Sequence, residues 1–402
     1  SWQNSDLSVR QAITTQIEEG AVLDASAIKD GDGGEIVVWS DISNPESVTT
    51  VAGSLLAKGG RQGGDGGEIE TSGFELDVVG IDIDATASKG KQGLWLLDPF
   101  DYTLGSSEAN AIVNALTTGS GGTDVTISTE ASSVTAGTST LSADNPSDAT
   151  GGTITVDATI NVASGDSGDL SLVADKDIQI NAALVNDGST NAALNLTSKT
   201  GVVINSGGSI DWNPGVTADI TISATDSGGL SGSGNIVNIA GTNLIINQVG
   251  ITEYSGVISA GGTLAKSGTG TLVLSGANTY SGSTAINGGK LQVKAGSGVS
   301  LNDATAVTVA SGARFDLEVP SGISDTYSGA IAGAGDVGKL GAGTLTLSNS
   351  GHSFTGLTDI DAGNLTVSGN LGTATVVDVA SGAIYQVSNA DTIGGLQGAG
   401  TV

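Results

Sequence analysis

The sequence predicts an all-β chain coiled into a solenoid, and three observations lead to this prediction. Short apolar or alternating runs recur along the chain, each separated from the next by glycine, asparagine, aspartate or serine. Period-two alternation places the apolar side chains on one face of a strand, and glycine supplies the positive-φ turns between strands. Only 3% of the 402 residues are aromatic and 64 are glycine, so we expect a thin, extended core. Strand units that repeat at a long period stack on one another as a solenoid.

Residues 1–20 form the first segment, and their pattern fits two structures. Ser5 or Asp6 suits a helix N-cap and Gly20 suits a stop. Between them, apolar residues recur at spacings near three and four: Leu7, Val9, Ala12, Ile13 and Ile17. This spacing predicts a short helix over residues 5–20 that caps the solenoid, although a pair of strands also fits.

Residues 21–104 repeat one pattern, a short apolar run followed by a glycine cluster. The successive clusters are Gly31-Asp-Gly-Gly-Glu-Ile36, Gly63-Gly-Asp-Gly-Gly-Glu68 and Gly93-Leu-Trp-Leu-Leu-Asp-Pro99. Three such phrases in this order are far more specific than Gly-Gly-Asp-Gly-Gly alone. They predict strand, glycine turn and strand as the structural unit.

On these phrases, residues 34–99 closely resemble the large exoproteins of the filamentous-haemagglutinin family, which are adhesins of Gram-negative bacteria exported by two-partner secretion. The resemblance implies a right-handed parallel β-helix. It also implies an outer-membrane transporter as a partner during secretion, and a location outside the cell or on its surface.

Residues 105–250 are predicted to continue as regular rungs of the solenoid. Ala109–Leu116 suits a second helical turn, while Val125–Ile127 and Ser139–Leu141 suit strands between turns. From residue 152 to residue 247 the alternation becomes regular, with paired apolar residues such as Ile178 and Ile180. Such pairs are spaced as the strands of successive solenoid turns would be.

Residues 251–402 carry a different repeat, whose two copies begin at Lys266 and Lys339. Lys266-Ser-Gly-Thr-Gly-Thr-Leu-Val-Leu-Ser275 is matched by Lys339-Leu-Gly-Ala-Gly-Thr-Leu-Thr-Leu-Ser348, and a ring-x-Gly phrase follows each copy. The pattern resembles the passenger-associated strand repeat of autotransporters. The asparagine of that phrase falls near Ser350 and His352 in the second copy, where a small insertion lies. The chain stops at Val402 within a repeat phrase and contains no methionine, so we expect a piece of a longer or processed protein.

The charge and the cysteine content limit the classes of partner. The net charge is −29, so nucleic acids and anionic bilayers would be repelled, and we expect no nucleic-acid partner. Such a surface favours solubility and would attract divalent cations. The absence of cysteine excludes disulfides and thiolate metal sites.

Catalytic chemistry has little support in the residue types, and the chain is predicted not to be an enzyme. His352 is the only histidine; it lies in a Ser/Gly turn, is expected to be a solvated loop residue, and has no acid placed beside it by the sequence. Asp82 and Asp84 point to the same side of a strand, which is the arrangement of some polysaccharide-cleaving β-helices. Because Ile81 and Ile83 take the other side, these carboxylates are predicted simply to face solvent.

The rings of the repeat region are predicted to stack in register in the core, as equivalent positions of successive turns do. A carbohydrate-stacking strip is the alternative, and it requires the rings to lie outside. The residues concerned are Tyr254, Tyr280, Phe315, Tyr327, Phe354 and Tyr385.

Calcium is the only cofactor with any support in the sequence. The weak candidate ligands lie in the glycine clusters: Asp30, Asp32, Asp65 and Glu68. Neither the calcium-binding β-roll spacing nor the EF-hand pattern is present, so turn formation is the competing interpretation. Two Asn-x-Thr patterns, Asn195-Leu-Thr197 and Asn364-Leu-Thr366, are weak glycosylation candidates.

The function predicted from these features is that of a secreted or cell-surface adhesin or stalk. A rigid rod would hold many weak binding surfaces against a host or neighbouring cell, glycan or matrix, in attachment or biofilm formation. The alternative is a protomer of an extracellular filament, because the open ends of a coil expose unpaired strand edges. A polysaccharide-active β-helix enzyme is the third class.

Overall fold

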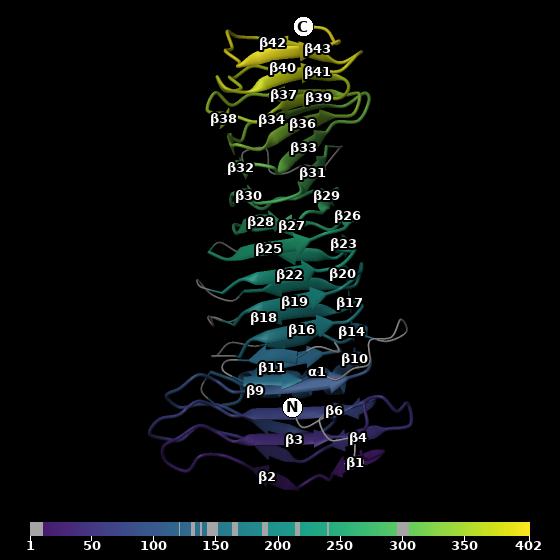
Figure 1. Ribbon diagram of the computed structural model, residues 1–402, viewed down its shortest axis with the longest axis vertical. Coiled ribbons are helices and arrows are strands. Elements are labelled where there is room, and N and C mark those ends of the chain that lie inside the picture. Colours follow the sequence, from purple (N-terminus) through teal and green to yellow (C-terminus); the bar gives the residue numbers. More distant parts are fainter. Residues whose placement is uncertain are drawn as a thin grey trace. The chain divides into compact units, whose positions relative to one another are not determined.

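The computed structural model describes residues 11–119, 121–129, 133–136, 139–142, 152–162, 168–186, 192–213, 218–238, 241–295 and 305–402. They divide into two compact units, residues 1–221 and residues 222–402. In each unit parallel strands are stacked turn on turn, so each unit is a parallel β-solenoid (Figure 1). The predicted all-β solenoid fold is therefore confirmed.

The first unit contains five columns of parallel strands and one hairpin. The longest column is β3 (Glu35–Trp39), β6 (Glu68–Gly73), β9 (Leu94–Pro99), β11 (Asp124–Ser128), β16 (Leu170–Ala174) and β19 (Leu194–Ser198). Two columns belong to the early turns: β1 (Thr14–Ile17), β4 (Val48–Val51) and β7 (Glu75–Asp77), and β2 (Val22–Asp24), β5 (Ser54–Leu56) and β8 (Asp82–Asp84). Two belong to the later turns: β10 (Tyr102–Leu104), β14 (Ile154–Val156), β17 (Asp177–Ile180) and β20 (Gly201–Ile204), and β15 (Ile160–Val162), β18 (Ala183–Asn186) and β21 (Ser209–Trp212). The antiparallel pair is β12 (Ser133–Ala136) with β13 (Ser139–Ser142).

In-register stacking of apolar side chains builds the core of this unit. Leu170 of β16 pairs with Leu194 of β19, and Ile178 of β17 pairs with Val202 of β20. All four side chains are buried, while the residues between them on each strand are turned outward. The period-two alternation of the sequence is thus the cause of the stacking, because each turn buries its face against the next.

A helix lies between β10 and β11, where a helical turn was predicted at residues 109–116. This helix, α1 (Ser106–Thr117), buries Ala109, Ile112 and Leu116 and contacts both β8 and β15. It therefore fills the space where the early strand columns give way to the later ones. Among the described residues no helix is long and apolar enough to cross a membrane.

The N-terminal prediction of a helix over residues 5–20 is wrong for the part that the structure describes. Residues 14–17 form β1, which pairs in parallel with β4 from Thr14 with Val48 to Ile17 with Val51. Long-range pairing with the next turn therefore overrides the apolar spacing near three and four. Residues 1–10 lie outside the described part of the chain.

Close approach between turns explains the glycine clusters of residues 31–67. Gly64 has a φ of +122°, and a Cβ there would lie 1.9 Å from the carbonyl oxygen of Gly31 in the preceding turn. At Gly66 a Cβ would lie 1.8 Å from the carbonyl oxygen of Ala85 in the following turn. No other residue fits these positions, because any side chain would force the two turns apart.

The second unit contains four columns of parallel strands. One contains β22 (Ile220–Ala224), β25 (Asn243–Gln248), β28 (Thr263–Ser267), β30 (Thr284–Ile286), β32 (Val307–Val309), β35 (Ile331–Gly333) and β38 (Ser353–Phe354). The next contains β23 (Leu230–Gly232), β26 (Ile251–Tyr254), β29 (Thr271–Leu274), β31 (Lys290–Lys294), β33 (Arg314–Glu318), β36 (Asp336–Leu340), β39 (Thr358–Ile360), β41 (Val376–Val379) and β43 (Gly395–Gly398). The shorter ones are β24 (Asn235–Val237) with β27 (Ile258–Ser259), and β34 (Ser324–Tyr327), β37 (Thr344–Leu347), β40 (Asn364–Val367) and β42 (Ile384–Val387).

Aromatic rings of the second unit lie in its core, as predicted, but they do not stack on one another in register: Tyr254, Tyr327 and Tyr385 pair with Leu274, Leu347 and Leu365. The fractions of surface exposed are 0% for Tyr254, Tyr280, Phe315 and Phe354, 3% for Tyr327 and 2% for Tyr385. The hydroxyl groups of Tyr254 and Tyr327 donate to the backbone carbonyls of Gly234 and Thr305 in the preceding turn. An external carbohydrate-stacking strip made of these rings is therefore excluded.

Candidate functional site

Each repeat copy of the second unit buries a lysine. Lys266 is 0% exposed, and its Nζ donates to the carbonyl oxygens of Ser267, Gly268 and Gly288 at 2.6, 3.3 and 3.4 Å. Its equivalent Lys339 is 1% exposed and donates to those of Leu340, Gly341 and Ala362 at 2.9, 2.6 and 3.0 Å. Burial lowers the pKa of both ammonium groups to about 8. Each lysine joins two successive turns by hydrogen bonds, which gives the lysine of the repeat phrase a structural role.

In the first copy a buried asparagine side chain forms hydrogen bonds with the backbone of its own turn and of the preceding turn. Asn278 is buried; its Oδ1 accepts the Ile258 backbone N–H at 2.9 Å, and its Nδ2 donates to the Gly276 carbonyl at 2.9 Å. Both halves of the amide are therefore paired. This interaction satisfies a buried backbone N–H of the preceding turn, which would otherwise be left without an acceptor.

His352 takes over this role in the second copy, and the prediction of a solvated loop residue is wrong. The side chain is only 6% exposed, and Nδ1 accepts the backbone N–H of Ile331, the repeat equivalent of Ile258, at 3.1 Å. Two turns later Asp391 does the same: its Oδ1 accepts the Leu371 N–H at 3.1 Å and its Oδ2 accepts the Tyr385 hydroxyl at 3.0 Å. In Asn278, His352 and Asp391 a side chain thus accepts a backbone N–H of the preceding turn, so the three residues form one kind of turn cap, although their residue types differ.

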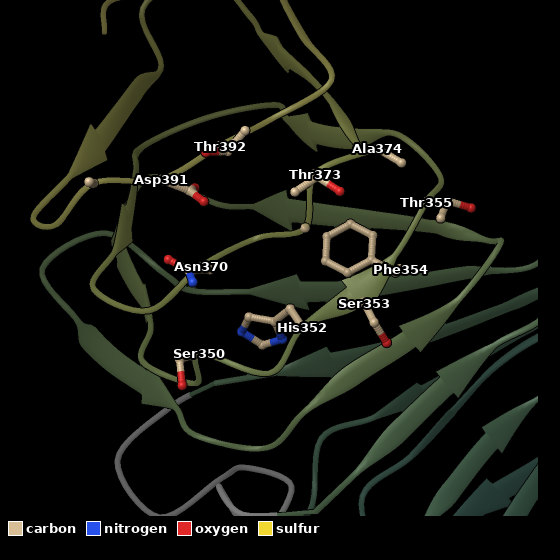
Figure 2. A pocket seen from close by; sticks show the side chains of 12 residues that line it. Ser350, His352, Ser353, Phe354, Thr355, Asn370, Thr373, Ala374, Asp391 and Thr392 are labelled. Atoms are coloured by element: carbon tan, nitrogen blue, oxygen red, sulfur yellow. The ribbon is translucent and has the colours of Figure 1, made fainter.

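A pocket of about 350 Å³ opens where His352 and Asp391 replace asparagine. Figure 2 shows the His352 and Phe354 rings together, with Asn370, Thr373 and Asp391 across the hollow from His352. The Phe354 ring meets the imidazole edge to face, at 6.3 Å between centroids and an interplanar angle of 73°. The pocket is lined by Ser350, residues 352–355, Asn370, residues 372–374 and residues 390–392, so three successive turns build it.

The imidazole is neutral and its tautomer is fixed. Burial lowers the pKa of His352 to about 4, although the charge of Asp391 acts in the opposite direction. Because Nδ1 accepts a hydrogen bond, the single proton of the neutral ring lies on Nε2. Within the described part of the chain Nε2 has no hydrogen-bond partner. The ring therefore holds a buried N–H donor that none of the described residues satisfies.

This arrangement does not suit nucleophilic catalysis, even though Ser350, His352 and Asp391 line one pocket. A serine-activating histidine donates Nδ1–H to the carboxylate and accepts the serine proton at Nε2. Here Nδ1 accepts from Ile331 and Nε2 carries the proton, which is the reverse arrangement. The structure thus brings an acid to the side of His352, which sequence reasoning missed, but not in the geometry of a general base.

Two of the four carboxylates proposed for calcium, those of Asp32 and Asp65, join successive turns by hydrogen bonds. Asp32 Oδ1 accepts the Asp65 N–H at 2.8 Å, and Asp65 Oδ1 accepts the Lys91 N–H at 2.9 Å. Glu68 lies in register with Glu35, and Asp30 bridges to Gly63. Among the described residues no group of three or more His, Asp or Glu side chains is placed to hold a metal ion.

The other carboxylate pair and the glycosylation candidates also lie on outward faces of strands. Asp82 and Asp84 flank the buried Ile83; Asp82 accepts the Ser54 hydroxyl at 3.2 Å and Asp84 pairs with Lys58 at 3.1 Å. The predicted outward alternation is confirmed. The two half-buried asparagine amides donate at 3.4 Å to side chains of neighbouring turns, from Asn195 to Ser171 and from Asn364 to Gln386.

A buried ion cluster on the second unit was not predicted. The Asp316 side chain is completely buried, with Arg314 Nε 2.6 Å from its Oδ1 and Lys290 Nζ 2.8 Å from its Oδ2. Arg314 also reaches Asp359 at 2.9 Å. A Cβ at Gly338, directly in register with Asp316, would lie 2.0 Å from Oδ1. The glycine leaves the space that this cluster occupies.

The fold and these turn caps define a class of protein, a parallel solenoid built partly of passenger repeats. The model of the passenger-associated-transport-repeat matches residues 264–293 and 338–367, which confirms both predicted copies. The chain is also similar to the Adhesin BmaC autotransporter of Brucella suis biovar 1 (strain 1330), with 30% identity over 165 residues. That alignment covers 35% of this chain and 5% of the relative, so the chain corresponds to a small part of that protein's length.

Proposed function

We propose that this chain is part of a surface-displayed adhesin of a Gram-negative bacterium. The observation that carries the proposal is the pair of passenger repeats, in each of which the equivalent buried lysine joins two successive turns of the second unit. Similarity to an autotransporter adhesin supports both the class and the location. The fold supplies stacked turns. The His352 hydrogen bonds are the reverse of those of a nucleophile-activating histidine, which agrees with a non-enzymatic role.

Export and attachment follow from this class of protein. An outer-membrane transporter would pass the chain to the cell surface; the passenger repeats favour autotransporter export, and the haemagglutinin-like residues 34–99 leave two-partner secretion as the alternative. Once folded, successive turns would present many weak contacts to a host or neighbouring cell surface, glycan or matrix. Attachment and biofilm formation are the processes that such contacts serve.

Bead adherence tests this function. Beads coated with the purified chain at increasing density should adhere to epithelial or bacterial cells, and adherence should rise more steeply than coating density, because avidity multiplies weak contacts. Beads coated with an unrelated acidic protein of matched charge control for electrostatic attraction. Failure of the coated beads to adhere to any cell or matrix surface, at any density, would refute the adhesin proposal.

Filament formation is the second candidate. An unpaired strand edge of a parallel solenoid can pair with a strand of another chain. Sedimentation velocity over a hundredfold dilution series would decide. A single monomer boundary throughout would remove this candidate, and concentration-dependent polymers would favour it.

A further inference from the structure

We propose that the pocket around His352 and Asp391 binds one neutral sugar residue of a glycan. The inference deepens the proposed adhesin function and rests on it for its biological meaning. Its physical basis is the difference between the two repeat copies. In the first copy the Asn278 amide is paired at both ends, whereas in the second the imidazole that replaces it lines the pocket and has a buried Nε2–H that pairs with none of the described residues.

The pocket offers both kinds of polar partner that a hydroxyl group requires. His352 Nε2–H is a fixed donor, because the hydrogen bond from Ile331 determines the tautomer. The Asp391 carboxylate is an acceptor: each oxygen already takes one hydrogen bond, from Leu371 and Tyr385, and each retains a further lone pair. Exposed threonine hydroxyls at positions 355, 373 and 392 line the rim. Since a sugar hydroxyl both donates and accepts, it matches this set.

Size and apolar surface restrict the ligand further. A volume of about 350 Å³ lies at the lower end of small-molecule pockets, so the site suits one sugar ring rather than a long chain. The methyl groups of Ala374 and Ala390 offer apolar surface to the C–H face of a ring. Phe354 packs edge to face with the imidazole and holds the donor in position.

Charge selects against acidic ligands. The lining residues of this pocket, all within the described part of the chain, include an aspartate but neither lysine nor arginine. The whole chain carries a net charge of −29, so an anionic sugar would meet repulsion without a compensating cation. A neutral hexose, 6-deoxyhexose or N-acetylhexosamine is therefore the expected class of ligand.

The single histidine makes a direct test practicable. In a ¹⁵N-labelled sample the imidazole gives one set of resonances, because the chain contains no other histidine. Titration with glucose, galactose, mannose, fucose and N-acetylglucosamine should shift the Nε2 resonance saturably for at least one sugar, and sialic acid should shift it less. No shift with any neutral sugar, or a larger shift with sialic acid, would overturn the proposal.

Matched variants locate the binding by calorimetry or saturation-transfer NMR. His352→Asn restores the cap of the first copy without the Nε2 donor, and Asp391→Asn keeps an acceptor for Leu371 but removes the charge; each should weaken binding at least tenfold. Thr355→Ala alters the pocket rim, whereas Ser281→Ala makes the same kind of change at the equivalent position of the first copy. Thr355→Ala should weaken binding and Ser281→Ala should leave it unchanged; equal losses would overturn the assignment to this pocket.

The two proposals fail separately. If no sugar binds but coated beads of wild type and His352→Asn adhere equally, the adhesin proposal stands and the sugar site is refuted. If sugar binds at His352 but coated beads do not adhere, the site stands and the adhesin proposal is refuted.

Discussion

Acidification should release the His352 cap at a pH far below that of an ordinary histidine. In the folded chain burial lowers the pKa of His352 to about 4, whereas the unfolded chain has the ordinary value near 6.5. A protonated imidazole carries N–H at both nitrogens. Nδ1 then ceases to be an acceptor, so protonation must break the 3.1 Å hydrogen bond from Ile331.

The sign and the size of the effect follow from these pKa values. Because the folded pKa is depressed, the unfolded chain binds the proton first as the pH falls below 6.5, and the fold loses stability down to pH 4. Between the two pKa values this loss amounts to about 3 kcal/mol of unfolding free energy for the turn that contains His352. Above pH 6.5 the contribution is fully present.

Two local measurements check this prediction without requiring the solenoid to unfold in one step. The histidine ¹⁵N resonances should titrate near pH 4 and report an Nε2–H tautomer at pH 7, and hydrogen exchange at the Ile331 amide should accelerate steeply between pH 5 and pH 4 beyond its intrinsic pH dependence. In His352→Asn, whose cap does not titrate, that extra acceleration should be absent. A titration midpoint near 6.5 would refute the reasoning, since it would mean that the ring is solvated.

Three further substitutions test other contacts by chemical denaturation, each with an internal comparison. Lys339→Met leaves three carbonyls without their charged donor and should cost about 1.5–3 kcal/mol, whereas Lys294→Met, at a half-exposed ion pair, should cost less than about 1 kcal/mol; equal losses would contradict the buried-lysine argument. Gly338→Ala places a Cβ 2.0 Å from a buried carboxylate and should cost about 1–3 kcal/mol, whereas Gly395→Ala meets a side chain only at 3.6 Å and should be nearly neutral. Burial raises the pKa of Asp124 to about 6, so its ionised form opposes folding above that pH. Asp124→Asn should therefore stabilise the chain by roughly 1–3 kcal/mol at pH 7 and have little effect at pH 4; stabilisation that is the same at both pH values would point to another cause.

The strands and their stacking could be predicted because one residue pattern determines both. Alternation such as Ile178 and Ile180 defines an inner face, and the repetition of that face in each turn requires parallel pairing in register. The helix at 106–117 could be predicted because the spacing of its apolar residues is a local pattern. At residues 14–17 the local apolar spacing predicted a helix where the structure has β1, because the pairing of β1 with β4 depends on residues more than thirty positions away.

The candidate site was harder to predict because its members come from different turns. The Asp316 cluster combines side chains from three turns, and no local spacing connects Lys290 with Asp359. His352 stood in a Ser/Gly turn, a context typical of solvated residues. A usable signal was nevertheless present: the repeat phrase requires a cap where the first copy has Asn278, and His352 is the residue able to accept a hydrogen bond at that place.

A regular repeat and a binding site make opposite demands on this position. The asparagine amide accepts the backbone N–H of the preceding turn and donates to a carbonyl of its own turn. A copy with asparagine at this position therefore has no unpaired amide group for a ligand. Histidine accepts the same kind of backbone N–H with Nδ1, and its second ring nitrogen, Nε2, carries an N–H that pairs with none of the described residues. An insertion beside it and an aspartate two turns later then supply the space and the acceptor. Recognition in such a solenoid is therefore expected where a copy departs from the repeat phrase while its backbone hydrogen bonds remain satisfied.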